Sequence, residues 1–353
     1  MKIALGMSGG VDSATAAIVL KNQGMEVLGT TLCLYDGALP ENGQFSPMAI
    51  SEEAALARAV CEKLGLEHTV IDGRNDFYHT VITDFINQYY KGNTPNPCIV
   101  CNKKIKFGFM LDKAFELGCD GIATGHYAKI ESAGDRFLLK KARDLKKDQS
   151  YMLYTLDQKA LSKSYFPLGE YTKEEIRELA RETGLINAEK KDSQDICFVP
   201  DGEYAEFIRK AKGEEYPAGY YVNQNGEILG EHKGIINYTI GQRKGLGIAL
   251  GRPQFVLSKD AAQNRVVLGD EEGLFHTRVL VENVNFIPFD NLWSPLKAKA
   301  KLRYRHTEQP VTIHPVSENE VLLEFSEPQR APSAGQSAVF YDGDIVLGGG
   351  IIK

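Results

Sequence analysis

The first half of the chain alternates short apolar runs with amphipathic stretches. Strands are predicted at the apolar runs 2–6, 27–32, 68–71 and 121–124. Helices are predicted at 14–22, at 51–65, and near 77–90 and 103–117. Strands that alternate with helices are typical of a parallel sheet covered by helices on both faces. We therefore expect an α/β domain over residues 1–200.

The pattern changes after residue 200. A short helical piece is followed by segments such as Gly241–Gly247 that are too rich in glycine for a helix interior, and we expect a small mixed module over 201–268. Short β-rich runs dominate 269–353, including a hairpin that turns at Asp342 and Gly343. These runs predict a C-terminal β-barrel.

A basic segment in this last region alternates strictly between charged and apolar residues. Lys297, Lys299, Lys301, Arg303 and Arg305 would share one face of a strand, and leucines, alanines and Tyr304 the other. Five cations at this spacing would extend over ~26 Å, which suits a phosphate backbone. The alternative is an ordinary solvated strand face whose lysines discourage edge pairing.

Composition narrows the class of protein. The 353 residues are 43% hydrophobic and 25% charged, which excludes a mostly disordered or collagenous chain and indicates more than one globular domain. Six cysteines are too few for a secreted disulfide scaffold, and the apolar runs are too short to span a membrane. The early glycine at position 6 leads us to expect no signal peptide. We expect a cytoplasmic protein with no membrane partner. Its net charge is −6, but twelve basic residues against seven acidic ones in 91–150 indicate an anionic partner.

A glycine loop follows the first predicted strand. Ser8-Gly9-Gly10-Val11-Asp12-Ser13 stands where a helix begins, so backbone N–H groups and the helix dipole would bind a pyrophosphate, with Asp12 ordering Mg²⁺. It is neither a Walker loop nor the dinucleotide pattern. The alternative is a tight turn from strand to helix with a capping aspartate.

Two segments contain cysteines in polar surroundings. Cys101 ends a proline-rich loop at a predicted helix start, where the helix dipole, Lys103 and Lys104 would stabilise a thiolate, so it is a candidate nucleophile. Cys197 could close on it as a second reactive thiol. A pair of buried structural thiols is the alternative, and the histidines lack the spacing of zinc ligands, so no metal site is expected.

The loop Ser8–Ser13 resembles the PP-loop of the ATP pyrophosphatase superfamily, which cleaves ATP between the α- and β-phosphates. Nearly the whole chain resembles a narrower family, the tRNA-specific 2-thiouridylases. The matching motifs are 6–13, Thr94-Pro95-Asn96-Pro97, Cys101-Asn102-Lys103, 123–127, 147–151, 191–193, Ile196-Cys197-Phe198, 241–245, 303–305 and 335–341.

The resemblance implies a role for each matching position. The residues implied to bind ATP are Gly6, Met7, Ser8, Gly9, Gly10, Val11, Asp12, Ser13, Leu32 and Gly125. The residues implied to meet tRNA are Asn96, Pro97, Cys98, His126, Lys147, Asp148, Gln149, Arg303, Tyr304 and Gln336. Cys197 would receive a persulfide from a sulfur-relay protein, with Cys101 as partner thiol. ATP with Mg²⁺ would adenylate the C2 oxygen of the wobble uridine before sulfur replaces it, and a Cys101–Cys197 disulfide would then form.

Cys98 departs from the family pattern, in which an aspartate stands at this position. Either its proton-transfer role is vacant, or Cys98, Cys101 and Cys197 form a three-thiolate set for an iron-sulfur cluster. Two further alternatives are a PP-loop synthetase of the argininosuccinate or GMP type, which would not require the two thiols, and a catalytically idle RNA-binding remnant.

Overall fold

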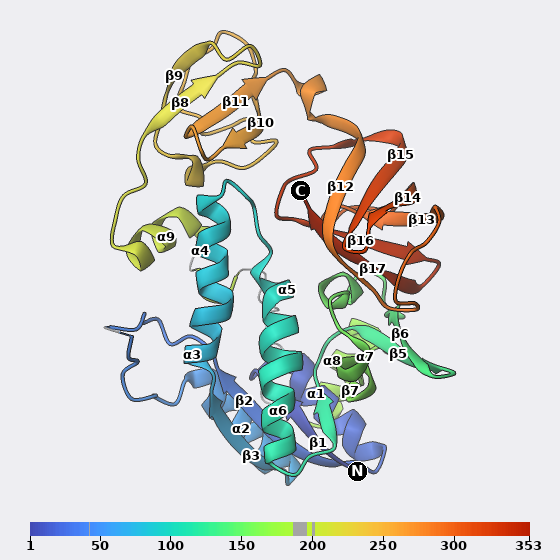
Figure 1. Ribbon diagram of the computed structural model, residues 1–353. Helices are drawn as coiled ribbons and strands as arrows, with labels where there is room; N and C mark the ends of the chain where they lie inside the picture. The colour runs from blue at the N-terminus through green and yellow to red at the C-terminus, as the bar shows by residue number, and fades with distance from the viewer. Residues whose placement is uncertain (42, 186–195, 200–201) are drawn as a thin grey trace. The chain divides into compact units, whose positions relative to one another are not determined.

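The computed structural model describes residues 1–41, 43–185, 196–199 and 202–353 (Figure 1). Its contacts divide the chain into two compact units. The first comprises 1–81, 98–198 and 343–347, and the second comprises 82–97, 199–342 and 348–353. No helix in the described part of the chain combines the length and the apolar character needed to cross a membrane.

A five-stranded parallel sheet forms the centre of the first unit, in the order β3-β2-β1-β4-β7. The strands are β1 (Lys2–Gly6), β2 (Glu26–Cys33), β3 (Glu67–Asp72), β4 (Gly121–Ala123) and β7 (Ser164–Tyr165). The register pairs Gly6 with Thr30 and Leu5 with Ala123, so the carboxyl ends of β1, β2 and β4 lie at the same edge. The predicted parallel α/β architecture is confirmed.

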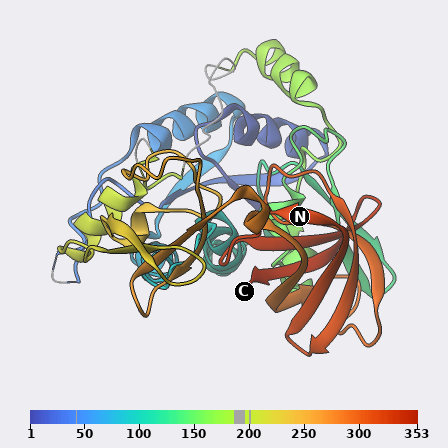
Figure 2. The same cartoon turned by 90° about the horizontal axis from the view of Figure 1, so that it is seen from above.

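Helices cover both faces of this sheet (Figure 2). On one face lie α1 (Val11–Asn22), α2 (Glu52–Leu64) and α8 (Lys173–Glu182), and Ile3, Val60 and Ile176 belong to one buried apolar cluster there. On the other face lies the helical run of α5 (Pro97–Cys101), the π-helical turn Asn102–Phe109 and α6 (Met110–Glu116). A Cβ at Gly6 would be 3.4 Å from Cε of Met110, so α6 packs onto the end of β1.

The helix signals in the sequence correspond to observed caps. The hydroxyl of Ser51 accepts a hydrogen bond from the N–H of Ala54 at 3.2 Å, and Gly65 ends α2 with a left-handed φ of 65°. This unit also contains α3 (Arg74–Phe77), most of the π-helical turn Tyr78–Ile82, the hairpin of β5 (Ala128–Ala133) and β6 (Arg136–Lys141), the 3-10 helix Ser150–Leu153, and α7 (Gln158–Ser162).

The second unit contains the predicted mixed module. Helices α4 (Thr83–Tyr90) and α9 (Tyr204–Lys212) contact through Tyr89 and Tyr204, whose rings stack at 4.8 Å. A four-stranded sheet follows, in the order β10-β11-β8-β9. Its strands are β8 (Gly219–Val222), β9 (Ile228–His232), β10 (Phe255–Asp260) and β11 (Arg265–Gly269). Tyr221, Val256 and Val266 lie in its buried core.

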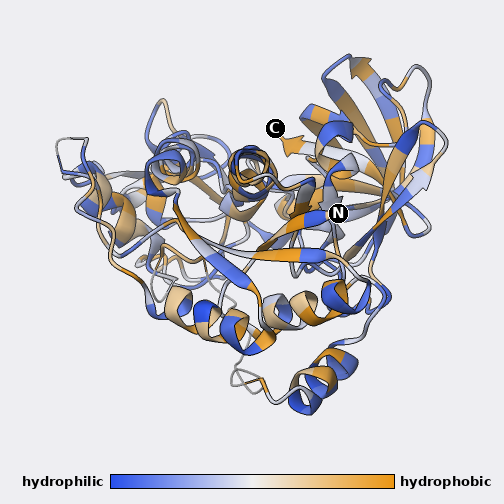
Figure 3. Ribbon diagram, turned by 90° about the horizontal axis from the view of Figure 1, so that it is seen from below, coloured by the Kyte–Doolittle hydropathy of each residue, from blue (hydrophilic) through white to orange (hydrophobic). Residues whose placement is uncertain are grey.

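Six further strands form the predicted barrel, in the order β12-β15-β14-β13-β16-β17, and pairing of β12 with β17 closes it. They are β12 (Phe275–Phe286), β13 (Leu296–Lys301), β14 (Gln309–Ser317), β15 (Glu320–Arg330), β16 (Ser337–Asp342) and β17 (Ile345–Ile352). Hydrophobic and hydrophilic bands alternate along the strands (Figure 3). Gly343 has a φ of 58°, as a tight turn at the predicted hairpin requires.

The basic strand is shorter than predicted. Strand β13 ends at Lys301, and a turn follows in which the N–H of His306 donates to the carbonyl of Arg303 at 3.1 Å. Lys297 and Lys299 are exposed on the strand, whereas Arg303 and Arg305 lie beyond it. The predicted single face of five cations is therefore wrong, because the chain turns before the alternation ends.

Candidate functional site

The glycine loop lies where an open parallel sheet usually binds ligands. Strand β1 pairs with β2 on one side and with β4 on the other, so the direction of strand succession reverses between β1 and β4. Loops that leave the carboxyl ends of two such strands diverge and open a crevice. The segment after β1 is Met7–Gly10, and the segment after β4 contains Gly125.

The loop is held by its own hydroxyl groups. The N–H of Ser8 donates to Oγ of Ser13 at 3.2 Å, and that hydroxyl donates to the carbonyl of Gly10 at 3.1 Å. Gly10 precedes α1 without a side-chain cap, so the first N–H groups of the twelve-residue helix are not covered by a capping side chain. A helix start of this kind binds anions.

Gly9 is required by the shape of the loop. Its φ is 68°, and a Cβ there would lie 2.9 Å from the carbonyl oxygen of Glu53. Gly10 differs, because its φ of −87° suits any residue and the nearest atom to its Cβ would be Ser8 Oγ at 3.4 Å. Only the first glycine is therefore demanded by backbone geometry.

The other predicted ATP-binding residues gather around this loop. Gly125 packs against it, since a Cβ there would lie 3.1 Å from the backbone nitrogen of Ser13. Leu32, half-buried on β2, lies two residues beyond the partner of Gly6. The side chains of Met7 and Val11 are buried, so only their backbone could meet a ligand.

Asp12 has partners that the sequence did not reveal. Nζ of Lys173 lies 2.8 Å from each of its carboxylate oxygens, and the Tyr127 hydroxyl donates to Oδ1 at 2.8 Å. The sequence predicts that this carboxylate orders Mg²⁺; in the structure it is paired with an ammonium and a phenol. The one available sequence signal was a lysine at the first position of a helix, where the dipole disfavours a cation.

The three candidate cysteines lie within electrostatic reach of one another. Cys101 is buried and interacts with both Cys98 and Cys197, while the latter two residues retain exposed surface. Burial raises the pKa of the Cys101 thiol to about 12, and it also raises the pKa of Cys98 and Cys197. The prediction that the helix start would favour a Cys101 thiolate is wrong, because desolvation outweighs nearby positive charge.

The lysine that acts on these thiols is also not one of those predicted from the sequence. Lys106 lowers the pKa of all three cysteines, whereas the sequence had suggested Lys103 and Lys104 for Cys101. Cys101 directly precedes the π-helical turn Asn102–Phe109, whose bonds run from i to i+5. The prediction relied on the lysines that directly follow Cys101 in the sequence, and the cation that acts on the thiols is instead Lys106.

The three thiols do not form a cluster site. Among the residues that the structure describes, no group of three or more His, Cys, Asp or Glu side chains is arranged to hold a metal ion. The alternative of an iron-sulfur cluster on Cys98, Cys101 and Cys197 is therefore not supported by their geometry. The six cysteines are all free, so no disulfide is present.

His126 is buried at the carboxyl end of β4. Its Nδ1 lies 2.6 Å from the hydroxyl of Thr124, and its ring packs between Phe107 and Phe166. Burial, and secondarily Lys106, hold the pKa of His126 well below its usual value, so the ring is neutral at physiological pH. A neutral imidazole could accept a hydrogen bond from a base or donate one to it. It carries no charge with which to form an ion pair with a phosphate.

The predicted tRNA contacts at 147–149 include two residues that stabilise their own loop. The buried carboxylate of Asp148 accepts from the N–H of Ala142 at 3.0 Å and from the hydroxyl of Ser150 at 2.8 Å. Gln149 accepts from the N–H of Tyr127 at 3.0 Å. These contacts orient the segment, and Lys147 is its half-buried cation. The matching motif at 191–193 lies outside the described residues.

Another group of predicted tRNA contacts lies in the second unit. The segment that carries Asn96 and Pro97 is fixed to the loop before β16: Gln336 Nε2 donates to the carbonyl of Thr94 at 2.7 Å, and the Thr94 N–H donates to the carbonyl of Ala334 at 2.8 Å. The structure thus brings Gln336 to a segment 242 residues away in sequence.

Arg303 lies beside the same loop. Its Nη2 donates at 2.8 Å to the carbonyl of Ala331 and to Oγ of Ser333. Arg303 and Tyr304 are half-buried. Arg303 therefore shapes the loop that carries Gln336, in addition to any contact with a ligand.

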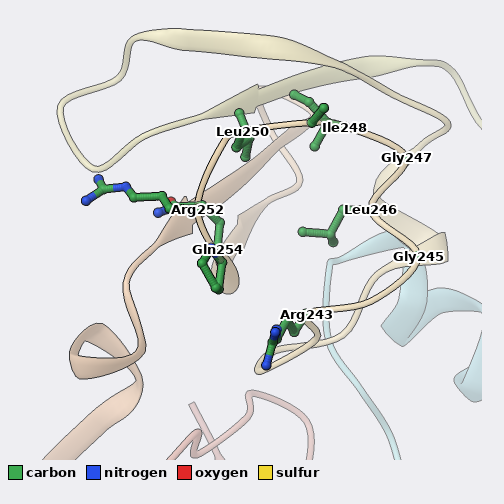
Figure 4. Close-up of a pocket in the computed structure, with 10 residues that line it drawn as sticks. Arg243, Gly245, Leu246, Gly247, Ile248, Leu250, Arg252 and Gln254 are labelled. Carbon is green, nitrogen blue, oxygen red and sulfur yellow. The ribbon is translucent and has the colours of Figure 1, made fainter.

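The glycine-rich segment of the central module borders an open cavity of about 480 Å³ (Figure 4). Arg243 and Arg252 are exposed at its border, and Leu246 is buried in the module's core. The lining residues are Arg243, Gly245, Leu246, Gly247, Ile248, Ala249, Leu250, Arg252, Pro253 and Gln254. The guanidinium of Arg252 is paired with Asp270 at 3.4 Å, whereas that of Arg243 is exposed at the border of the cavity.

Three family models match the chain in succession. Residues 1–201 match the tRNA methyl transferase HUP domain, residues 205–270 match the tRNA methyl transferase PRC-barrel domain, and residues 276–352 match the aminomethyltransferase β-barrel domain. The three matches follow the order of the parallel α/β sheet, the small module and the closed barrel.

Curated relatives match over the full length. The tRNA-specific 2-thiouridylase of Clostridioides difficile is 48% identical, over 100% of this chain and 98% of the relative. That of Acetivibrio thermocellus is 47% identical, over 100% of this chain and 99% of the relative. A crystal structure of a 4-thiouridine synthetase–RNA complex with bound ATP superposes with a TM-score of 0.36 and 17% identity, over 60% of this chain and 50% of that chain.

Proposed function

This chain belongs to the tRNA-specific 2-thiouridylase family, and we propose that it is an ATP-dependent tRNA sulfurtransferase that converts the wobble uridine of tRNA to 2-thiouridine. The observation that carries the proposal is the presence, in one compact unit, of an anion-binding loop at a sheet switch point and of two mutually interacting thiols. A PP-loop synthetase that uses ammonia or an amine would not need these thiols.

The first step uses the loop and its surroundings. We place the phosphates of ATP at the N–H groups of Ser8–Ser13, with Gly125 allowing close approach and Leu32 bordering the nucleotide. The C2 oxygen of uridine attacks the α-phosphate, and pyrophosphate leaves. Mg²⁺ would enter on the nucleotide phosphates, a common mode for this ion. Adenylation turns the C2 oxygen into a leaving group.

The second step uses the thiols. A persulfide on Cys197, received from a sulfur-relay protein, attacks C2 with its terminal sulfur, and AMP leaves. The Cys101 thiolate then attacks Sγ of Cys197, the bond between the two persulfide sulfurs breaks, and the electron pair forms the thiocarbonyl. A Cys101–Cys197 disulfide remains, and an external thiol reduces it. The exposure of Cys197 and the burial of Cys101 support this division of roles.

tRNA binding is assigned to both units. The residues proposed to meet tRNA are Asn96, Pro97, Cys98, His126, Lys147, Asp148, Gln149, Arg303, Tyr304 and Gln336. Asp148 and Gln149 would act by orienting Lys147, and Gln336 by holding the Thr94–Pro97 segment. Residues 1–200, 201–268 and 269–353 would work as an ATP-binding domain, a tRNA-contacting module around Arg243, and a tRNA-binding barrel. A tRNA substrate favours location in the cytoplasm.

The proposal is tested by incubating purified protein with unmodified tRNA, ATP and a persulfide donor, followed by mass spectrometry of the digested nucleosides. We expect 2-thiouridine only when ATP is present, and none with Cys101→Ser or Cys197→Ser. Formation of an aminated product, or binding of tRNA without any thiolation, would point to the synthetase or the RNA-binding remnant instead.

A further inference from the structure

The carboxylate of Asp12 is enclosed by two segments of the first unit, the start of α8 and the segment that follows β4. Lys173, at the start of α8, approaches both carboxylate oxygens at 2.8 Å, and Tyr127, after β4, donates its hydroxyl at 2.8 Å. Gly125 packs against Asp12 itself, since a Cβ there would lie 3.2 Å from Cβ of Asp12. The side chain of Asp12 is thus fixed from several directions.

Lys173 is an unusual lysine. Its side chain is only 4% exposed, against 29% for Asp12. A buried ammonium requires an anionic partner, and the first turn of a helix disfavours a cation. A capping box of Thr172 and Glu175 begins α8, and the N–H of Lys173 donates to Asp144 at 3.1 Å. The backbone therefore fixes Lys173 in a place where the carboxylate of Asp12, 2.8 Å from its ammonium, supplies an opposite charge.

We propose that Lys173 is a positioning residue for the phosphate loop, and that its ammonium, rather than a metal ion, neutralises Asp12. The inference rests on the proposed binding of ATP at this loop. Asp12 lies in the first turn of α1, next to Ser13, whose hydroxyl bonds Ser8 and Gly10. By holding Asp12, Lys173 fixes the turn whose N–H groups receive the phosphates.

The test compares Lys173→Gln, Asp12→Asn and the double variant. The measurement is calorimetric binding of α,β-methylene ATP, which cannot be cleaved between these phosphates, once with Mg²⁺ and once with EDTA. We expect each single variant to bind at least about tenfold more weakly, by the same factor in both buffers. The double variant should bind no more weakly than the weaker single variant, because both changes break one interaction.

A metal-ligand role for Asp12 gives the opposite pattern. Lys173→Gln would then bind the analogue with Mg²⁺ as tightly as the wild type or more tightly, and the defect of Asp12→Asn would disappear in EDTA. Either result overturns the proposal. A wild-type protein that fails to bind the analogue would instead contradict the proposed function.

Two further variants separate positioning from general stability. Arg143→Gln removes an exposed ion pair, at 3.2 Å, with Glu175, which lies on α8 together with Lys173. This variant should leave ATP affinity unchanged. Tyr127→Phe keeps the buried ring and removes only the hydroxyl that bonds Asp12, so it should weaken analogue binding by about threefold or more even if the charge variants fold poorly. Analogue affinity equal to wild type in Tyr127→Phe, or lost in Arg143→Gln, would contradict the proposal.

Discussion

The glycine loop and the three cysteines Cys98, Cys101 and Cys197 lie in the same compact unit, but their surroundings have opposite effects on negative charge. The loop favours an anion, whereas the surroundings of the cysteines disfavour a thiolate. Around the loop, a helix start, three hydroxyl groups and a buried lysine form a fixed polar setting before any ligand arrives. Around Cys101, burial suppresses the thiolate, and Lys106 offsets only part of that effect. The same unit therefore contains a loop suited to binding an anion and a nucleophilic thiol that burial keeps protonated.

A protonated Cys101 is an advantage in the proposed sulfur transfer. A permanently ionised Cys101 would be exposed to oxidation and to premature attack on the persulfide. Because the buried thiol of Cys101 is seldom ionised, its attack on the persulfide is delayed. The rate of sulfur release should therefore depend on the protonation state of Cys101.

Cys101→Ser and Cys197→Ser should each abolish 2-thiouridine formation, because serine can neither carry a persulfide nor reduce one. The affinity for ATP and for tRNA should stay close to wild type, since phosphate contacts supply most of the binding energy. Nucleoside mass spectrometry checks the first claim and binding isotherms check the second. Cys61→Ser, at a buried cysteine on α2, is a control that should keep activity.

The rate of a single turnover should rise with pH. Because the pKa of Cys101 is raised to about 12, its thiolate fraction below that value grows about tenfold for each pH unit. Sulfur release should therefore accelerate between pH 7 and pH 9, and Lys106→Gln should slow it, because removal of the cation raises this pKa further. A flat profile in rapid-quench experiments would exclude Cys101 ionisation from the rate.

Gly9→Ala should weaken ATP binding by about tenfold and destabilise the fold by about 1–2 kcal/mol, because φ is positive and a backbone oxygen lies 2.9 Å from the added carbon. Gly10→Ala is the matched variant and should be tolerated, because its φ is ordinary and the nearest atom to the added carbon, Ser8 Oγ at 3.4 Å, is at van der Waals distance. Chemical denaturation and calorimetry measure the two effects. Equal behaviour of the two variants would mean that the loop does not adopt this conformation when ATP binds.

Lys299→Ala should have the smallest effect. Lys299 is exposed on β13, so its loss should weaken tRNA binding a few-fold and lower the slope of log affinity against log salt by roughly 0.7–0.9. Lys113→Ala removes an exposed cation that pairs with Glu116 in the first unit, and serves as the control. If the isotherms of Lys299→Ala and wild type coincide at several salt concentrations, Lys299 faces solvent and does not contact tRNA.

Local sequence signals predicted much of the fold and part of the site. The phosphate loop could be predicted because strand, glycines and helix start follow one another within a few residues. The partners of Asp12 could not, because Tyr127 and Lys173 lie 115 and 161 residues away, and neither periodicity nor spacing reports such contacts.

Two errors arose from assuming regular structure. Lys103 and Lys104 were predicted because they directly follow Cys101 in the sequence, whereas Lys106, within a π-helical turn that the sequence did not reveal, is the cation that acts on its thiol. The basic strand was drawn too long because alternation in sequence continues through a turn that ends the strand at Lys301. In both places the backbone geometry is imposed by contacts with other parts of the chain, which the local sequence pattern does not reveal.

The most direct test of the central claim is the stoichiometry of one turnover. Protein carrying a Cys197 persulfide is mixed with unmodified tRNA and ATP, and AMP, pyrophosphate and 2-thiouridine are counted together. The account predicts equal amounts of all three, with a Cys101–Cys197 disulfide in the spent enzyme. Formation of ADP and phosphate, or of AMP and pyrophosphate without 2-thiouridine, would contradict it.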